Sequence, residues 1–263
     1  MNRLPQVFSN GKAFIPFITA GDPSLEITEQ LVINMAEAGA DLIELGIPFS
    51  DPIAEGPVIQ EADNRALIAG TTTDKIFAMV GRIRQTCQVP IAFMTYINPI
   101  FTYGTERFME NCQTVGVDVL IVPDMPYEEK QELLPDCLKY GVTLISMIAP
   151  TSQQRIRMIA SEAQGFIYCV SSMGVTGMRQ ELSNNVEHMI KSVKEVKDIP
   201  CAIGFGISTP EQAKQMARFA DGVIVGSAIV NIIGQYGEDC VPHVMEYVRG
   251  MNKATKQQYE KQQ

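Results

Sequence analysis

The sequence predicts an α/β protein, namely a single (β/α)8 barrel of the TIM type with an extra helix at the N-terminus. Three observations predict this fold: short apolar runs recur along the chain, amphipathic stretches separate them, and the chain has 263 residues. Apolar runs without polar alternation are typical of parallel strands buried on both faces. A barrel of such units takes about 250 residues. An open, doubly wound sheet is the alternative arrangement.

The expected strands are the apolar runs at residues 14–19, 42–45, 90–94, 117–122, 143–148, 166–170, 202–204 and 222–225. Between them, apolar residues at helical spacing predict helices at 25–38, 128–140, 154–163, 186–196 and 211–219. Two of these helices have clear starts, because Thr151-Ser152-Gln153-Gln154 and Thr209-Pro210-Glu211-Gln212 both fit a capping box.

The length would also allow two small domains, but no proline- or glycine-rich linker divides the chain. Residues 1–252 are therefore expected to form one barrel domain. Residues 253–263 are polar and rich in Lys and Gln, so we expect a frayed tail.

Composition limits the location and the partners. The formal net charge of −9 disfavours nucleic acid, because phosphate backbones repel an acidic chain. No apolar run reaches the roughly 20 residues that span a bilayer, and the N-terminus has no apolar signal region. The six cysteines are scattered without a C-x-x-C pair, which indicates buried free thiols and a cytoplasmic protein.

Glu44 is the leading candidate for chemistry because it lies inside the apolar run Leu42-Ile43-Glu44-Leu45, near the end of an expected strand. Working groups of barrel enzymes stand at the C-terminal ends of strands. A carboxyl group surrounded by apolar side chains has a raised pKa, which suits acid–base work near neutral pH. The alternative is a buried Glu paired with a basic residue, the nearest in the following sequence being Arg65.

The loop after Glu44 contains three prolines and two further acids, Asp51 and Glu55. Loops that follow barrel strands often carry function. Either acid alone could be a solvated loop charge, whereas together with Glu44 they indicate a site with more than one carboxylate.

Three glycine-containing segments follow the last three expected strands: 171–177, 204–206 and 226–227. Glycines let backbone N–H groups approach an anion, and a helix N-terminus adds partial positive charge. Each segment alone could be a tight turn. Their common position in the C-terminal half predicts a phosphate site, which barrels build after strands 7 and 8.

Several cofactor chemistries are disfavoured by the residues present. No lysine falls at the C-terminal end of an expected strand, as a Schiff base would need. His188 and His243 both lie in helical stretches, so neither a metal site nor a catalytic triad is expected. The segment from Gly204 lacks the third glycine of a dinucleotide-binding loop. The chemistry that the sequence still allows is acid–base catalysis on a phosphorylated molecule, without a cofactor.

The segments LIELGIPFSDP at 42–52 and GPVIQ at 56–60 resemble the signature of the tryptophan synthase alpha chain family. FIPFITAGDP at 14–23, GVTG at 174–177, GFGIS at 204–208 and GSA at 226–228 resemble the same family in the same order. The resemblance implies cleavage of indole-3-glycerol phosphate to indole and glyceraldehyde 3-phosphate, as part of L-tryptophan biosynthesis. It implies a retro-aldol step without a metal or a Schiff base.

The resemblance also implies roles for single residues. Glu44 would be the acid–base residue, and Glu55 would hold the indole N–H, although the family usually has Asp in an Ala-Asp-Gly-Pro sequence at that position. The implied substrate contacts are Phe17, Tyr96, Tyr168 and Thr176. The implied phosphate contacts are Gly177, Phe205, Gly206, Gly226 and Ser227.

The family works with a beta chain, so the resemblance implies an alpha2-beta2 tetramer with Pro48, Phe49 and Asp51 at the interface. It implies no cofactor in this chain, because pyridoxal phosphate belongs to the beta chain. The alternatives are a stand-alone indole-releasing lyase, an activator subunit with little chemistry of its own, and another phosphate-binding barrel such as a sugar-phosphate isomerase or epimerase.

Overall fold

The strands form one closed parallel barrel in the computed structural model, which describes residues 2–170, 179–204 and 206–257. Their order around the sheet is β5-β4-β3-β2-β1-β9-β8-β7-β6. The strands are β1 Ala13–Thr19, β2 Ile43–Gly46, β3 Ile91–Met94, β4 Val119–Ile121, β5 Thr143–Leu144, β6 Ser146–Ile148, β7 Ile167–Val170, β8 Cys201–Gly204 and β9 Gly222–Val225. The predicted barrel is confirmed.

The fifth predicted strand is divided between two neighbours. β5 pairs with β4, and β6 pairs with β7, while only Ile145 separates the two pieces in sequence. One continuous segment therefore joins both halves of the sheet and closes the barrel.

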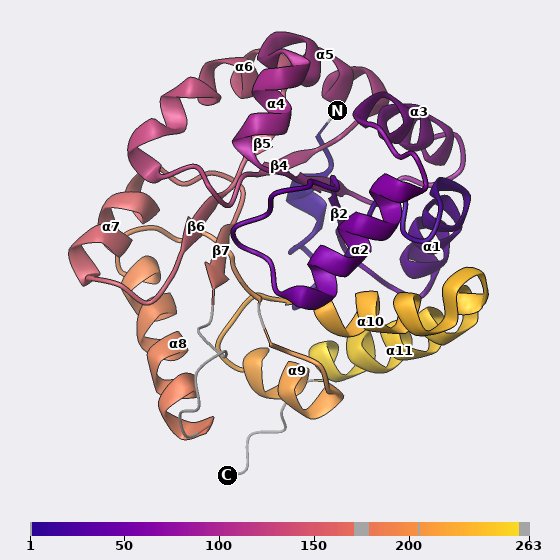
Figure 1. Ribbon diagram of the computed structural model, residues 1–263. Coiled ribbons are helices and arrows are strands. Elements are labelled where there is room, and N and C mark those ends of the chain that lie inside the picture. Colours follow the sequence, from indigo (N-terminus) through magenta and orange to yellow (C-terminus); the bar gives the residue numbers. More distant parts are fainter. Residues whose placement is uncertain (1, 171–178, 205, 258–263) are drawn as a thin grey trace.

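Helices surround the barrel on its outside, as Figure 1 shows. The α-helices are α1 Leu25–Glu37, α2 Pro57–Ile68, α3 Thr73–Ile83, α4 Ile97–Tyr103, α5 Thr105–Val115, α6 Leu134–Tyr140, α7 Gln153–Glu162, α8 Arg179–Lys194, α9 Pro210–Met216, α10 Ser227–Tyr236 and α11 Cys240–Lys256. Three short 3-10 helices are η1 Leu4–Gln6, η2 Tyr127–Glu132 and η3 Gly237–Asp239.

Two predicted helices differ in detail from the observed ones. The extra N-terminal helix is the short η1, anchored by buried Leu4. The helix expected at 128–140 is divided into η2 and α6, because Leu133 and Pro135 begin a new helix there. The capping box predicted at Thr209 is confirmed, whereas the cap of α7 lies one residue later than predicted, with Ser152 in place of Thr151 as the residue that accepts from the backbone N–H of Arg155.

The expected tail begins later than predicted. α11 continues to Lys256, and both Ala254 and Thr255 are buried. The Lys256 ammonium group also lies 2.9 Å from the Asp41 carboxylate. This part of the predicted tail therefore belongs to the barrel, because an apolar helix face continues through the polar sequence. Residues 258–263 lie outside the described part of the chain.

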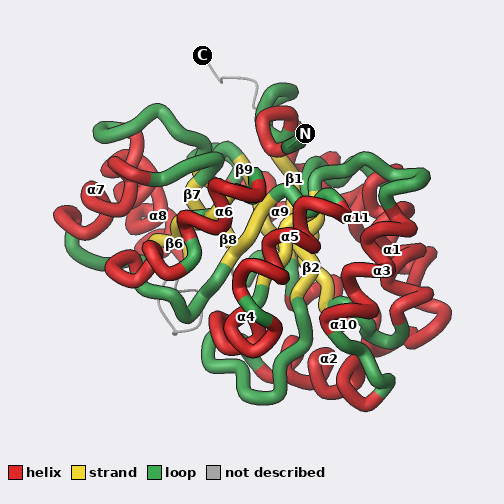
Figure 2. Tube along the Cα trace, turned by 90° about the horizontal axis from the view of Figure 1, so that it is seen from above, coloured by secondary structure: helices red, strands yellow, loops and turns green. Residues whose placement is uncertain are grey.

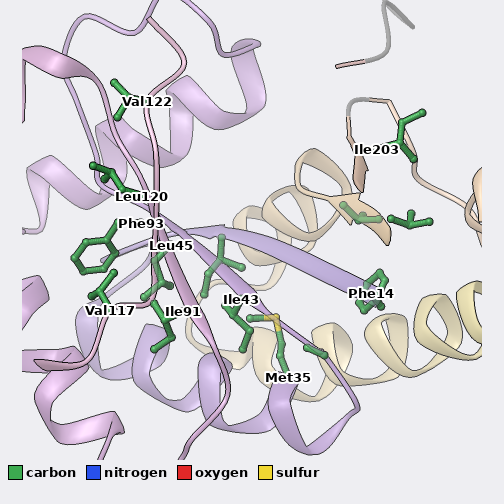
Figure 3. Close-up of a cluster of buried hydrophobic side chains, with 14 of the residues drawn as sticks. Phe14, Met35, Ile43, Leu45, Ile91, Phe93, Val117, Leu120, Val122 and Ile203 are labelled. Atoms are coloured by element: carbon green, nitrogen blue, oxygen red, sulfur yellow. The ribbon is translucent and has the colours of Figure 1, made fainter. Parts of the chain in front are cut away.

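Buried side chains form an inner and an outer layer, because successive strand residues point to opposite faces. Leu42, Ala92 and Ala202 belong to the cluster inside the barrel. Ile43 and Leu45 belong to the larger cluster between the strands and the helices, part of which is shown in Figure 3.

The two ends of the barrel differ in content. Figure 2 shows the N-terminal segment at one end, with α2 and α4 at the opposite end. At the N-terminal end, the buried Asp118 carboxylate accepts hydrogen bonds from the backbone N–H groups of Arg3 (2.8 Å) and Ile91 (3.1 Å). It also pairs with the guanidinium groups of Arg3 and Arg84. This network fixes the chain start against the barrel.

We expect Asp118→Ala to lower the free energy of unfolding by about 3–5 kcal/mol, because it leaves Arg84 without its charge partner in a buried place. Urea unfolding followed by circular dichroism measures the change. Asp74→Ala is the matched control, since the Asp74 ion pair with Arg107 is largely exposed and should contribute little. Equal losses in both variants would contradict the assignment.

Candidate active site

Glu44 points into the barrel interior. In β2 the side chains alternate, so Leu42 inside and Ile43 outside place Glu44 inside. The strand register puts Glu44 beside Phe17 of β1 and Ala92 of β3. The carboxyl group therefore enters the core from a strand end, at the side of the barrel where α2 begins.

The Glu44 carboxyl group is fully buried, and neither of its oxygens has a hydrogen-bond partner among the described residues. The alternative of a buried ion pair fails, because the Arg65 guanidinium group bonds both oxygens of Asp22 at 2.7 and 2.8 Å. Loss of solvation raises the pKa of Glu44 to about 8. The carboxyl group is thus mainly protonated at neutral pH.

A cavity of about 510 Å³ opens at the same end of the barrel, a volume suited to a small organic ligand. Its walls come from the strand ends and the loops that follow them. The lining residues are Phe17, Ala54, Glu55, Gly56, Ile59, Met94, Pro123, Met147, Tyr168, Val170, Gly206, Ile207, Ser208, Ile224, Gly226, Ser227 and Ala228. No lysine or arginine is among these described residues.

Two aromatic side chains of the site depend on glycines at neighbouring strand ends. A Cβ atom on Gly46 would lie 2.6 Å from the Phe17 ring, and one on Gly204 would lie 2.5 Å from the Tyr168 hydroxyl. A Cβ on Gly226 would also meet Phe17, at 3.2 Å. These glycines therefore leave the space in which Phe17 and Tyr168 stand beside Glu44. The charge of Glu44 adds to burial in raising the pKa of Tyr168.

Glu55 lies in the loop between β2 and α2, at the edge of the cavity. Its carboxylate accepts a hydrogen bond from the Tyr96 hydroxyl group. Burial raises the pKa of Glu55, while that hydrogen bond opposes the rise. Tyr96 is buried and does not line the cavity among the described residues; its hydroxyl group contacts Glu55, and its predicted substrate contact stays a prediction.

Asp63 is a further buried carboxyl group that the sequence did not single out. It lies on the inner face of α2, where it accepts from the Thr19 hydroxyl at 3.5 Å and from the backbone N–H of Phe49. Burial, and then the nearby charge of Glu55, raise the pKa of Asp63 to about 7. The sequence feature that could have identified Asp63 as buried is its position on the same helix face as Ile59, Ala62 and Ala66.

The predicted phosphate contacts are placed in part. Gly226 precedes the first turn of α10, which contains no acidic residue, and Ser227 is its first residue. Gly206 has a φ of 73°, a conformation that favours glycine. All three line the cavity. Phe205, Thr176 and Gly177 lie outside the described residues.

The predicted interface residues lie in the same loop as Glu55. Pro48 is buried, Phe49 is half-buried against the Tyr96 ring, and Asp51 is exposed. Ile53, which the sequence did not suggest, is 79% exposed. The accessible part of this loop thus combines a charge with an apolar side chain.

The cavity also contains residues that sequence reasoning missed. Met94, Met147 and Val170 stand at or near strand ends, where the barrel rule could have placed them, but their apolar character suggested only core. No group of at least three His, Cys, Asp or Glu suitable for a metal ion occurs in the described part of the chain. Within the same residues, no helix has the length and apolarity to cross a membrane.

Together the fold and the site define a barrel enzyme with a buried, protonated carboxyl group beside residues that line a mainly apolar cavity. A family model described as "Tryptophan synthase alpha chain" matches residues 6–257. The tryptophan synthase alpha chain of Lacticaseibacillus casei is 46% identical, covering 97% of this chain and 96% of that protein. The one of Shouchella clausii (strain KSM-K16) is 48% identical, covering 95% and 96%.

Solved structures agree with these relatives. Tryptophan synthase subunit alpha from Legionella pneumophila str. Paris is 37% identical with a TM-score of 0.88, covering 97% of this chain and 98% of that chain. A chain of the tryptophan synthase a2b2 complex from Pyrococcus furiosus is 35% identical with a TM-score of 0.85, covering 92% and 98%. The chain belongs to the tryptophan synthase alpha chain family. The predicted lyase activity on indole-3-glycerol phosphate in tryptophan biosynthesis is confirmed with the family.

We expect Glu44→Gln to stabilise the fold, and to do so more at pH 8.5 than at pH 5. The folded-state pKa of about 8 lies above the unfolded value, so the wild type loses stability as pH rises between about 4.5 and 8. The glutamine variant does not share this loss, which amounts to a few kcal/mol. Urea unfolding at both pH values measures the gap between the two proteins.

Glu61→Gln, which changes an exposed carboxylate on α2, is the control for the substitution itself. The assignment fails if the stability gap between wild type and Glu44→Gln is the same at pH 5 and pH 8.5.

Proposed function

We propose that Glu44 transfers the proton in the cleavage of indole-3-glycerol phosphate to indole and glyceraldehyde 3-phosphate. One observation carries this proposal: a buried carboxyl group without partners among the described residues, protonated at neutral pH, beside Phe17 and Tyr168, which line the cavity. Such a group can donate a proton and, once ionised in an apolar place, recover one readily.

The reaction needs one proton to move within the substrate. Glu44 donates its proton to the indole ring carbon that carries the glycerol chain, which leaves a positive charge on the ring. The Glu44 carboxylate then takes the proton of the neighbouring glycerol hydroxyl. The carbon–carbon bond breaks, its electron pair returns to the ring, and the oxygen becomes the aldehyde. Glu44 ends the cycle protonated, as it began.

Glu55 is proposed to accept a hydrogen bond from the indole N–H and to stabilise the positive charge on the ring. An ionised carboxylate at the edge of an apolar cavity stabilises such a charge more strongly than water does. Support comes from its position at the cavity wall and from the Tyr96 hydrogen bond, which favours the ionised form.

The remaining roles follow the shape of the cavity. Phe17 and Tyr168 are proposed to hold the indole ring, since both line the cavity beside Glu44. Gly206, Gly226 and Ser227 are proposed to bind the phosphate through backbone N–H groups and the start of α10. Without a basic side chain in the described lining, helix and backbone dipoles supply the attraction. The roles of Thr176, Gly177 and Phe205 stay proposals from the family resemblance.

The chain is proposed to work with a tryptophan synthase beta chain in an alpha2-beta2 tetramer, since the similar chain from Pyrococcus furiosus belongs to an a2b2 complex. Phe49, Asp51 and exposed Ile53 are the proposed contact, with buried Pro48 shaping the loop. Alpha chains of this family hold no cofactor, and pyridoxal phosphate is bound by the beta chain. The six buried free cysteines support a cytoplasmic location.

Indole release tests the two carboxylates. We expect Glu44→Gln to abolish detectable turnover, because the amide cannot donate and recover the proton. We expect Glu55→Ala to lower kcat by about 10²- to 10³-fold, the usual effect of losing one charge-stabilising group. Single-turnover measurement of indole separates chemistry from release. Turnover in Glu44→Gln at the wild-type rate would refute its role, and wild-type rates in Glu55→Ala would refute that of Glu55.

The pH dependence offers an independent check. Because Glu44 must be protonated to act, we expect kcat to fall as pH rises above about 8. Measurement of kcat from pH 6 to 10 locates the limb. A plateau to pH 10, or a limb near pH 5, would contradict a protonated Glu44.

Mixing experiments separate the proposed partnership from its alternatives. A purified beta chain should raise indole release by this chain, and the exposed-loop variant Ile53→Ser should weaken that effect without changing the activity of the isolated chain. A stand-alone lyase would show no response to the beta chain. An activator subunit would stimulate the beta chain while releasing almost no indole itself.

A further inference from the structure

We propose that Tyr96 is the positioning residue that adapts this site to a glutamate at position 55. The proposal rests on the proposed role of Glu55. Its basis is the set of contacts made by one phenol: the Tyr96 hydroxyl group donates to the Glu55 carboxylate and accepts from the backbone N–H groups of Ala54 (2.8 Å) and Ile53 (3.1 Å). Three consecutive residues of one loop thus meet at a single oxygen atom.

The Tyr96 ring holds the other end of the same loop. Its centroid lies 5.4 Å from the centroid of the Phe49 ring, with the planes tilted by 37°. The segment from Phe49 to Glu55 is therefore fixed against Tyr96 at both its beginning and its end. A loop held in this way keeps its carboxylate at one place on the cavity wall.

Tyr96 is itself fixed by the barrel. It is 3% exposed and directly precedes α4, whose first residue, Ile97, donates its backbone N–H to the Asp124 carboxylate at 3.0 Å. The backbone of Thr95 continues the β3–β4 pairing through its N–H bond to Ile121. The phenol therefore takes its position from two paired strands and the start of α4.

The length of the side chain explains why this contact matters here. The aspartate that the family resemblance implies at this position is shorter by one methylene group, about 1.5 Å of reach. With the backbone of Ile53 and Ala54 held by the same hydroxyl, an aspartate would fall short of the phenol. The extra length of Glu55 is taken up by the Tyr96 hydrogen bond, so the longer acid does not move freely into the cavity.

The hydrogen bond also sets the charge of Glu55. Burial raises the pKa of this carboxyl group, and the Tyr96 hydrogen bond lowers it again. Burial and the contact with Glu55 in turn raise the pKa of Tyr96, so the phenol stays protonated and remains a donor. The pair thus keeps one negative charge on Glu55 and one proton on Tyr96.

A double-mutant cycle on the full chain tests the proposal, with indole-3-glycerol phosphate as substrate. Tyr96→Phe removes only the hydroxyl group. We expect it to lower kcat by about 10- to 100-fold with less than about 3-fold change in KM, because Glu55 stabilises charge in the transition state. In the Glu55→Asp background, the same substitution should lower kcat less than about 3-fold.

The pH profile supplies a second readout that a purely structural residue would not move. Loss of the phenol removes a hydrogen bond to the ionised carboxylate, so the acid limb of the kcat profile should shift to higher pH in Tyr96→Phe. Tyr103→Phe is the matched control, because that hydroxyl group lies at the other end of α4 and bonds to exposed Asp74. It should leave kcat and the acid limb unchanged.

Two results would overturn the positioning role: equal losses on Tyr96→Phe in the wild-type and Glu55→Asp backgrounds, or an unmoved acid limb in Tyr96→Phe. If Glu55→Asp is too slow to measure, the acid limb decides. Failure of the proposed function looks different, because Glu55→Ala would then turn over like the wild type whatever Tyr96 does. Urea unfolding of each variant confirms that the compared proteins are folded.

Discussion

The site depends on one constraint, which is that the Glu44 carboxyl group stays in an apolar barrel without a partner. Its two oxygens face no hydrogen-bond donor among the described residues, so the group exists there mainly in its neutral form. A basic residue beside Glu44 would lower the pKa of the carboxyl group again, and Glu44 would then have no proton to donate at neutral pH. Arg65, the next basic residue along the sequence, is paired with Asp22 instead.

The opposite end of the barrel shows the contrasting solution. Asp118 is as buried as Glu44, yet it receives two backbone N–H groups and two guanidinium groups. A buried carboxylate with this many donors is stabilised in its charged form and contributes to the fold. The same carboxyl chemistry thus gives a stabilising charge at the N-terminal end and a neutral acid, suited to the proposed proton transfer, at the C-terminal end, and the number of donors decides which.

Much of this was predictable from local patterns. The apolar runs located the strands, and Glu44 stood out because a charge inside such a run is costly. The contacts of Tyr96 with Ala54 and of Asp63 with Thr19 were not predictable, because they join residues 42 and 44 positions apart whose meeting depends on barrel closure. The two-part fifth strand was hidden for a related reason: no turn residue interrupts the sequence at Ile145, and only the different partners of β5 and β6 divide the strand.

Position 55 shows that two different acidic residues can place a carboxylate at the same point of a site. What the chemistry needs is a negative charge at a fixed point of the cavity wall, and that point is set by the backbone, the side-chain length and the anchor together. Glutamate and aspartate differ in length, but a phenol held by β3 and α4 can absorb the difference. In the proposed mechanism, one acid can therefore replace the other at this position only together with its anchor. Glu55 and Tyr96 then act as a pair rather than as single residues.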